Sequence, residues 1–290
     1  MRHMLAAPIL VIGATGNVGR RLAAELTAQD AAVRAMVRAP ASARLPAQTE
    51  IVRGDLTAPE SIDSCIQGVH TVFLLWQAPG TTVAEVIGRM ARQVRRIVFL
   101  SNQTVRDDRE VQEYAVSSLH AEIERAIAAS GVEWTFLRPG AFAANARLWW
   151  ARQIRSGDVV RWPFARAHTA PVHEADIAAV AVRALVETGH AGAKYLLTGP
   201  QSLTQQEQVE ILAKALGRPL RFEEMPEETA LTELSDLLSP AIATMLMDAW
   251  RRRVDEPEIV TATVAEITGA PARSFHQWAS DHAADFASES

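Results

Sequence analysis

A glycine-rich loop near the start of the chain restricts the fold more than any other feature of the sequence. The loop, GATGNVG over residues 13–19, follows the apolar run 9–12 and opens a segment, 17–29, whose apolar residues recur at helical spacing. A strand, a glycine loop and a helix in this order form the setting in which helix N-terminal N–H groups bind the pyrophosphate of a dinucleotide. The residues expected at this site are Gly13, Thr15, Gly16, Asn17, Val18 and Gly19.

Short apolar segments alternate with amphipathic segments through the first half of the chain. We expect strands at 8–13, 33–37, 50–53, 70–76, 96–100 and 132–137, with helices at 17–29, 59–67, 82–94 and 110–130. This alternation predicts an α/β fold with a doubly wound parallel sheet, a Rossmann domain over residues 1–140.

The pattern becomes less regular after residue 140. Helices are expected at 142–155, 174–186, 202–216 (with Ser202 as N-cap), 225–253 and 275–286, and short strands at 194–198 and 220–223. We expect residues 141–290 to form a smaller, mostly helical, substrate-side region that returns in part to the sheet.

Composition excludes several classes of function. The net charge is −5, from 29 basic and 34 acidic side chains, so we expect no nucleic acid partner. The apolar runs are too short to span a membrane, and no leader segment is expected at the start. One cysteine, Cys65, rules out a disulfide framework, and no metal-ligand spacing is present. These features favour a cytoplasmic protein that acts on a small molecule; its oligomeric state is left open.

Several segments together resemble a known family. They are the G-x-x-G-x-x-G loop, VRGDL at 52–56, the segments 73–79 and 96–101, EWTFLRPG at 133–140, FAAN at 142–145 and PVHEADIA at 171–178. The set resembles the NmrA-like atypical short-chain dehydrogenase/reductases, close to their quinone-oxidoreductase-like branch, over roughly residues 9–225. The resemblance implies that Asp55 and Leu56 meet the adenine and that Leu75 and Trp76 lie beside the nicotinamide ribose.

The end of the second expected strand indicates which dinucleotide is bound. NAD-specific sites place a carboxylate there, whereas this chain has Arg38. A guanidinium matches the charge and geometry of a 2′-phosphate, so we expect NADP(H) in preference to NAD(H). Arg44 or Arg53 could assist. The alternative is that Arg38 is only a solvated charge at a strand end.

The scarcity of lysine excludes the usual mechanism of these enzymes. Orthodox members use Tyr-x-x-x-Lys on one helix, and this chain has only Lys194 and Lys214. The residues four positions after Tyr114 and Tyr195 are a serine and a glycine, so neither tyrosine has such a partner.

Three residues remain as candidate catalytic groups. His120 stands where the family has its lysine, and could hold the cofactor ribose or act as an acid; otherwise it is a surface residue. Tyr114 could be a substrate-side acid or a packing residue. Ser101 ends the fifth expected strand, where it could hydrogen-bond a substrate carbonyl or cap the next loop.

Seven tryptophans are a high number for a chain with two tyrosines. We expect Trp76, Trp149 and Trp150, with Asn145, to line a pocket for an aromatic or hydrophobic substrate. For any one tryptophan, packing in the core is an equally good interpretation.

Three functions fit these observations. The first is an NADPH-dependent oxidoreductase that reduces a small carbonyl, quinone or enone, with the hydride chemistry supplied by the cofactor. The second is a non-catalytic regulator that senses NADP(H), and the third is a non-redox cyclase or isomerase of a biosynthetic pathway. The fold alone does not separate them.

Overall fold

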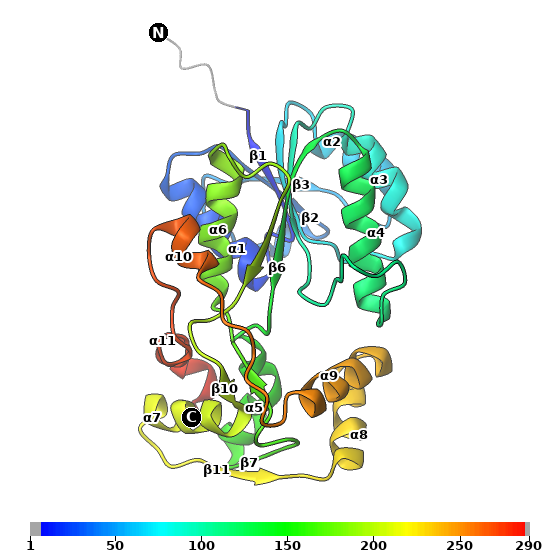
Figure 1. Cartoon of the computed structure of the whole chain (residues 1–290). Helices are drawn as coiled ribbons and strands as arrows, with labels where there is room; N and C mark the ends of the chain where they lie inside the picture. The colour runs from blue at the N-terminus through cyan, green and yellow to red at the C-terminus, as the bar shows by residue number, and fades with distance from the viewer. Residues whose placement is uncertain (1–6, 288–290) are drawn as a thin grey trace. The chain divides into compact units, whose positions relative to one another are not determined.

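The computed structural model describes residues 7–287, which fall into two compact units. The first, here called the sheet unit, contains residues 7–113, 117–139 and 174–196. The second unit contains Tyr114–Val116, 140–173 and 197–287. The chain leaves the sheet unit after Pro139, and then returns to it with one helix and one strand (Figure 1).

The sheet unit is built on a seven-stranded sheet in the order β3-β2-β1-β4-β5-β6-β9. The registers from β3 to β6 are all parallel, with Ile9 of β1 opposite Val33 on one side and Thr71 on the other. The doubly wound parallel sheet is thus confirmed. The strands are β1 (Ile9–Ile12), β2 (Val33–Val37), β3 (Glu50–Arg53), β4 (Thr71–Leu74), β5 (Arg96–Leu100), β6 (Glu133–Pro139) and β9 (Ala193–Leu197).

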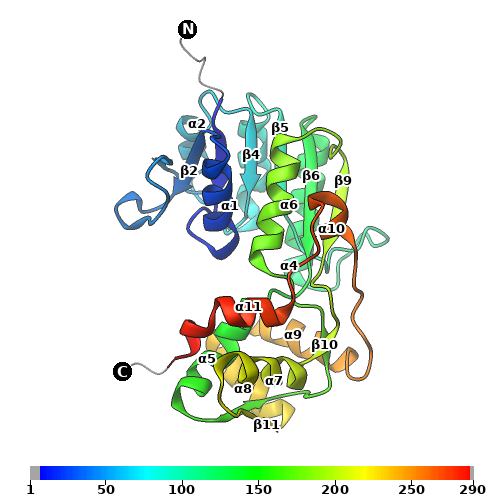
Figure 2. The same cartoon turned by 90° about the vertical axis from the view of Figure 1, so that its left-hand side faces the viewer.

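Helices cover both faces of the sheet (Figures 1 and 2). One face carries α1 (Asn17–Ala28) and α6 (Glu174–Val186), and the other carries α2 (Ile62–Cys65), α3 (Val83–Met90) and α4 (Ala115–Ala129). Short 3₁₀ turns occupy Pro40–Ser42, Pro59–Ser61 and Gly80–Thr82. Because both faces are covered, the central strands read as continuous apolar runs, which is why the sequence identified them.

The second unit is mostly helical, as expected. Its helices are α5 (Asn145–Ser156), α7 (Gln205–Leu216), α8 (Glu227–Leu237), α9 (Pro240–Arg252), α10 (Thr263–Thr268) and α11 (Phe275–Asp281), followed by the turn Ala283–Phe286. Two small sheets complete it: β7 (Val159–Trp162) pairs with β11 (Arg221–Glu224), and β8 (His168–Thr169) with β10 (Leu203–Thr204).

Two local expectations in the second unit are wrong. The helix expected over 225–253 is two helices, because Ser239 is an extended N-cap and Pro240 begins a new helix. The cap of α7 is Thr204, which forms a reciprocal capping box with Glu207. Ser202 instead accepts a hydrogen bond from the backbone N–H of Glu258.

Within residues 7–287, no helix combines the length and the apolar character needed to cross a membrane.

Candidate active site

The glycine loop has the geometry of a phosphate-binding turn. Gly13 has φ +87°, in the left-handed region that favours glycine, and its carbonyl accepts the N–H of Gly16 at 3.1 Å. A Cβ at Gly19 would lie 2.2 Å from the Gly13 carbonyl oxygen, so this glycine is required by the packing of α1 on the loop. A Cβ at Gly16 would meet only that same oxygen, at 3.4 Å. The loop is therefore open above Gly16.

The start of α1 is exposed where a ligand would approach. Thr15, Gly16 and Asn17 are exposed, whereas Val18 and Gly19 are buried and can contribute only backbone groups. The N-cap residue of α1 is Gly16, so no side chain caps the helix, and the first turn contains no acidic residue. The positive end of the helix dipole is thus available to an anion.

A cavity adjoins the loop at the carboxyl ends of β1, β2 and β4. Several residues expected at the cofactor site line it, but Arg44 and Arg53 do not. The lining residues are Ile12, Gly13, Thr15, Met36, Val37, Arg38, Gly54, Asp55, Leu56, Leu75 and Gln77. The structure therefore brings together residues from four separate parts of the chain that the sequence had assigned to one ligand.

The two charged residues of this cavity have different roles. The backbone N–H and the hydroxyl of Thr57 both donate to Asp55 Oδ1, at 2.9 Å each. These hydrogen bonds, the backbone one first, lower the pKa of Asp55, and the charge of Arg38 adds to the effect. Asp55 therefore stays ionised, and its Oδ2 makes no hydrogen bond within the sheet unit. Arg38 is exposed at the end of β2.

Trp76 does not line the cavity, although we expected it there. Its side chain is 7% exposed in the core beneath α3, and its indole N–H donates to the Ala78 carbonyl at 2.7 Å. The neighbouring Gln77 lines the cavity instead. The sequence held no signal for Gln77, because strand alternation past the last sheet residue does not fix which side chain turns outward.

Ser101 follows β5 and joins a buried polar network. Its hydroxyl donates to Glu124 Oε1 at 2.5 Å, and Arg138 donates to the same carboxylate from Nε at 2.9 Å and from Nη2 at 2.5 Å. Arg138 also binds both oxygens of Asp107, which accepts a further bond from Lys194 at 2.6 Å. The hydrogen bonds from Arg138, ahead of those from Lys194, lower the pKa of Asp107 to about 2. Sequence reasoning missed Arg138 and Asp107.

The other catalytic candidates lie on or beside α4. The His120 ring is half-buried and stacks on Phe99 of β5, with centroids 5.7 Å apart. One turn earlier, the Ser117 hydroxyl is 2.5 Å from that of Thr104. Tyr114 immediately precedes the helix and belongs to the second unit. The second tyrosine, Tyr195 on β9, is hydrogen-bonded to His190 at 2.9 Å, and burial raises its pKa.

The residues expected around a substrate belong to the second unit. Trp149 and Trp150 pack against Trp162 and Trp250 with ring centroids 5.2–6.4 Å apart, and all four are buried. The four tryptophans belong to the hydrophobic core of that unit. This arrangement agrees with packing in the core, the alternative to a substrate pocket. Asn145 is the half-buried first residue of α5.

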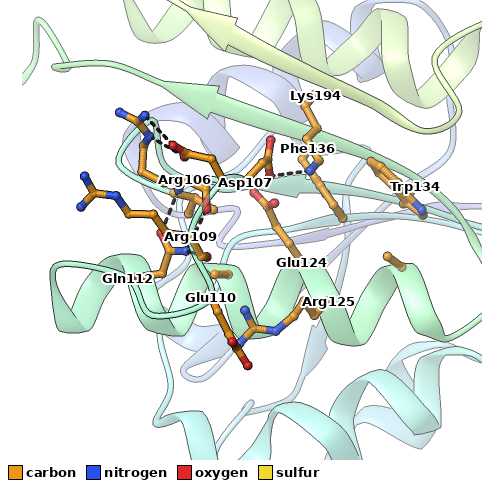
Figure 3. A pocket seen from close by; sticks show the side chains of 14 residues that line it. Arg106, Asp107, Arg109, Glu110, Gln112, Glu124, Arg125, Trp134, Phe136 and Lys194 are labelled. Atoms are coloured by element: carbon orange, nitrogen blue, oxygen red, sulfur yellow. Dashed lines mark hydrogen bonds and ion pairs between the residues drawn. The ribbon is translucent and has the colours of Figure 1, made fainter.

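A second, larger cavity of about 800 Å³ opens beside α4 (Figure 3). It lies between the loop 105–112, α4, β6 and β9, and shares no residue with the cavity at the glycine loop. Trp134 and Phe136 stack on each other in its wall, with centroids 4.1 Å apart, and Glu124 also faces it.

Residues 13–188 match the model of a family described as NAD(P)H-binding. The chain belongs to this family. The match covers the glycine loop, the adjoining cavity and α4, so the family assignment and the geometry concern the same residues. Binding of NAD(P)H by this family member is consistent with the exposed Gly16 and the open N-terminus of α1.

Two relatives of this NAD(P)H-binding protein that exceed 30% identity are reductases. A (4-alkanoyl-5-oxo-2,5-dihydrofuran-3-yl)methyl phosphate reductase from Streptomyces griseus is 40% identical over 285 residues, covering 97% of this chain and 100% of the relative. An NAD(P)H azoreductase from Xenophilus azovorans is 31% identical, covering 96% and 99%. An NADPH-dependent quinone oxidoreductase from Escherichia coli, solved with NADPH, has a TM-score of 0.80 at 25% identity, covering 94% and 99%. The expected oxidoreductase, close to quinone reductases, is thereby confirmed.

Proposed function

We propose that the protein reduces a small conjugated carbonyl compound, an enone of the butenolide type, with NADPH. The observation that carries this proposal is the 40% identity, over nearly the whole chain, to a reductase of an alkanoyl-dihydrofuranone phosphate. Such a substrate has a C=C bond polarised by two carbonyl groups, and it accepts a hydride readily. Quinones and azo compounds, on which other relatives act, share this electron-poor character.

The chain's own residues would hold and orient the cofactor. The backbone at Gly16 and the N-terminus of α1 would bind the pyrophosphate, and Asp55 Oδ2 would accept from the adenine amino group. Arg38 would hold the 2′-phosphate, which supports NADP(H) over NAD(H). His120, one turn before Glu124 on α4, would contact the ribose of the nicotinamide half.

When bound, the cofactor supplies the hydride, and the reaction also consumes one proton. Lys194 is paired with Asp107 and Lys214 lies on α7, so neither serves a tyrosine as the family's lysine does. The Ser101 hydrogen is directed at Glu124. We therefore propose that water delivers the proton, which an electron-poor substrate allows because its reduced form is readily protonated.

The test is cofactor oxidation by the purified protein, followed through the near-ultraviolet absorbance of the reduced cofactor. The panel contains an alkanoyl butenolide with and without its phosphate, a naphthoquinone, an azo dye and a saturated ketone, each with NADPH and NADH. We expect the butenolides to react fastest and the saturated ketone not to react. Oxidation with the saturated ketone alone, or with no compound, would contradict the proposal.

A further inference from the structure

The direction of one hydrogen bond fixes what Ser101 can offer to a ligand. In the 2.5 Å contact with Glu124, the Ser101 hydroxyl is the donor and the carboxylate oxygen accepts its hydrogen. Arg138 donates to both oxygens of the same carboxylate. The Ser101 hydrogen is therefore directed at Glu124, and the lone pairs of the hydroxyl oxygen are what Ser101 can offer to a ligand.

Stability alone does not account for a buried ion pair at this place. Glu124 is 5% exposed, on the same helix as the buried apolar residues Ala121, Ile123 and Ile127. A buried carboxylate–guanidinium pair gives little or no net stabilisation relative to apolar residues of similar volume. Arg138 is held further by Asp107, which also accepts from Lys194 beside the large cavity (Figure 3). We therefore interpret this network as a device that holds the Ser101 side chain in one orientation.

Ser101 lies at the edge of the sheet where doubly wound folds bind their ligands, and the residue is 5% exposed. Ser101 is at the carboxyl end of β5, next to β4, and the residues after β4 line the cofactor cavity. Its own N–H is bound to the Leu137 carbonyl at 2.7 Å, which fixes the backbone. Within the sheet unit, no group donates a hydrogen bond to its hydroxyl oxygen.

We propose that Glu124 and Arg138 are positioning residues that make Ser101 a hydrogen-bond acceptor for an N–H or O–H donor of the bound ligands. This inference rests on the proposed reductase function and reverses one of the two roles expected for Ser101, a hydrogen bond to a substrate carbonyl. The donor is either the carboxamide of the nicotinamide or a hydroxyl group of the substrate. A substrate carbonyl directed at Ser101 would meet only lone pairs.

The first experiment compares NADPH with its acetylpyridine analogue, in which a methyl ketone replaces the carboxamide and removes the donor. Binding of each to the full-length protein is measured by calorimetry, so that no turnover is needed. The wild type should prefer NADPH, and Ser101→Ala should reduce this preference about tenfold, as for one buried hydrogen bond. A purely structural role would weaken both cofactors equally and leave the ratio unchanged.

The second experiment removes the acceptor of the Ser101 hydrogen. Ser101 and Arg138 Nε share Glu124 Oε1, so Glu124→Leu is combined with Arg138→Met, which replaces both partners of the buried pair by apolar residues. The hydroxyl can then turn its hydrogen toward a ketone, so the preference for NADPH should fall. Adding Ser101→Ala to this double variant should bring the ratio to that of Ser101→Ala alone. Asp107→Asn, the matched control, removes the other partner of Arg138 and should leave the ratio as in the wild type.

The third experiment tests the substrate as the source of the donor. The ratio of KM values for a naphthoquinone and its hydroxynaphthoquinone counterpart is measured in the same variants. A shift of about tenfold in either the cofactor ratio or this KM ratio supports the proposal and assigns the donor. If NADPH binds normally and neither ratio moves in Ser101→Ala or in Glu124→Leu with Arg138→Met, the proposal is wrong and the reductase function stands. If the wild type binds no NADPH, the proposed function itself fails.

Discussion

Gly16 and Gly19 differ in a way that separates ligand binding from folding. Gly16 has φ −80° and ψ 176°, which any residue can adopt, and a Cβ there meets only one oxygen, at 3.4 Å. At Gly19, a Cβ would lie 2.2 Å and 2.7 Å from two backbone atoms of Gly13, and 2.9 Å from Ala14 Cα. Real Cβ atoms do not approach backbone this closely, so α1 would have to move away from the loop.

The expected stabilities follow from these distances. In Gly16→Val, the loss of a good N-cap residue and the reduced entropy of the unfolded chain offset each other, so the free energy of unfolding should change by less than about 1 kcal/mol. In Gly19→Ala, overpacking against backbone should cost about 3 kcal/mol or more. Urea denaturation of both variants measures the difference.

The NADPH affinity of Gly16→Val tests ligand binding, just as the stability of Gly19→Ala tests packing. The valine side chain in Gly16→Val occupies the space that a pyrophosphate needs, so at least one charge-assisted hydrogen bond is lost, worth about 1.5–3 kcal/mol. NADPH binding measured by calorimetry should weaken about ten- to a hundredfold or more. A folded Gly16→Val protein that binds NADPH like the wild type would refute the placement of the phosphates over Gly16.

Three further changes test other parts of the site. Arg38→Ala should weaken NADPH about ten- to a hundredfold and leave NADH almost unchanged, measured by calorimetric titration; equal losses for both cofactors would show that Arg38 does not contact the 2′-phosphate. Tyr114→Phe should lower kcat less than tenfold and His120→Ala should lower kcat/KM more, in steady-state kinetics with the best substrate of the panel; a thousandfold fall for Tyr114→Phe with intact NADPH binding would restore a tyrosine acid. Asp107→Asn should lower the free energy of unfolding by up to about 1 kcal/mol, since the carboxylate is half-exposed. Because the folded-state pKa of Asp107 is about 2 and its ordinary value is 3.8, that difference should be constant above about pH 5, decrease as the pH falls through 3.8, and vanish only below about pH 2. A difference that stays the same from about pH 5 to about pH 1 would show that charge is not its cause.

The sequence predicted the sheet unit well because burial on both faces leaves a simple pattern. The strands at 33–37, 50–53 and 96–100 and the helix at 174–186 lie where they were expected. In the second unit, β7 and α10 were missed, since Val159–Trp162 is short and pairs only with the short strand β11. A brief strand of that kind carries too few residues to show a period.

The loop before α4 shows a second limit. The helix was expected to begin near residue 110, but it begins at Ala115. The side chain of Gln112 accepts the Arg106 N–H and donates to the carbonyls of Arg106 and Arg109, which closes residues 106–112 into a loop. Such side-chain bonds to the backbone compete with helix formation and leave no periodic signal.

The candidate site divides in the same way. The parts that rest on backbone geometry, such as the glycine loop, Arg38 and Asp55, follow from fixed positions along the chain, and the structure places them around one cavity. Arg138 meets Glu124 and Asp107 only through its side chain, across 14 and 31 residues of sequence. Contacts of this kind leave no periodic signal, and the sequence assigned no role to Glu124.

The proton balance and the substrate class constrain each other. The Ser101 hydrogen is donated to Glu124 and does not protonate a substrate, and a phenol with no lysine four residues on has an ordinary pKa near 10, too high for an effective acid at neutral pH. A saturated ketone needs a proton as the hydride arrives, since its alkoxide is a strong base. An enone, quinone or azo compound spreads the incoming charge over a conjugated system, and water can protonate it afterwards. The lack of a tyrosine–lysine pair thus agrees with the names of relatives that reduce dihydrofuranones, quinones and azo compounds. We predict that restoring the pair, by Val116→Tyr with His120→Lys, would extend the substrate range toward saturated ketones. A double variant that binds NADPH but gains no activity on saturated ketones, in the same cofactor-oxidation assay, would show that the acid is not what restricts the substrates.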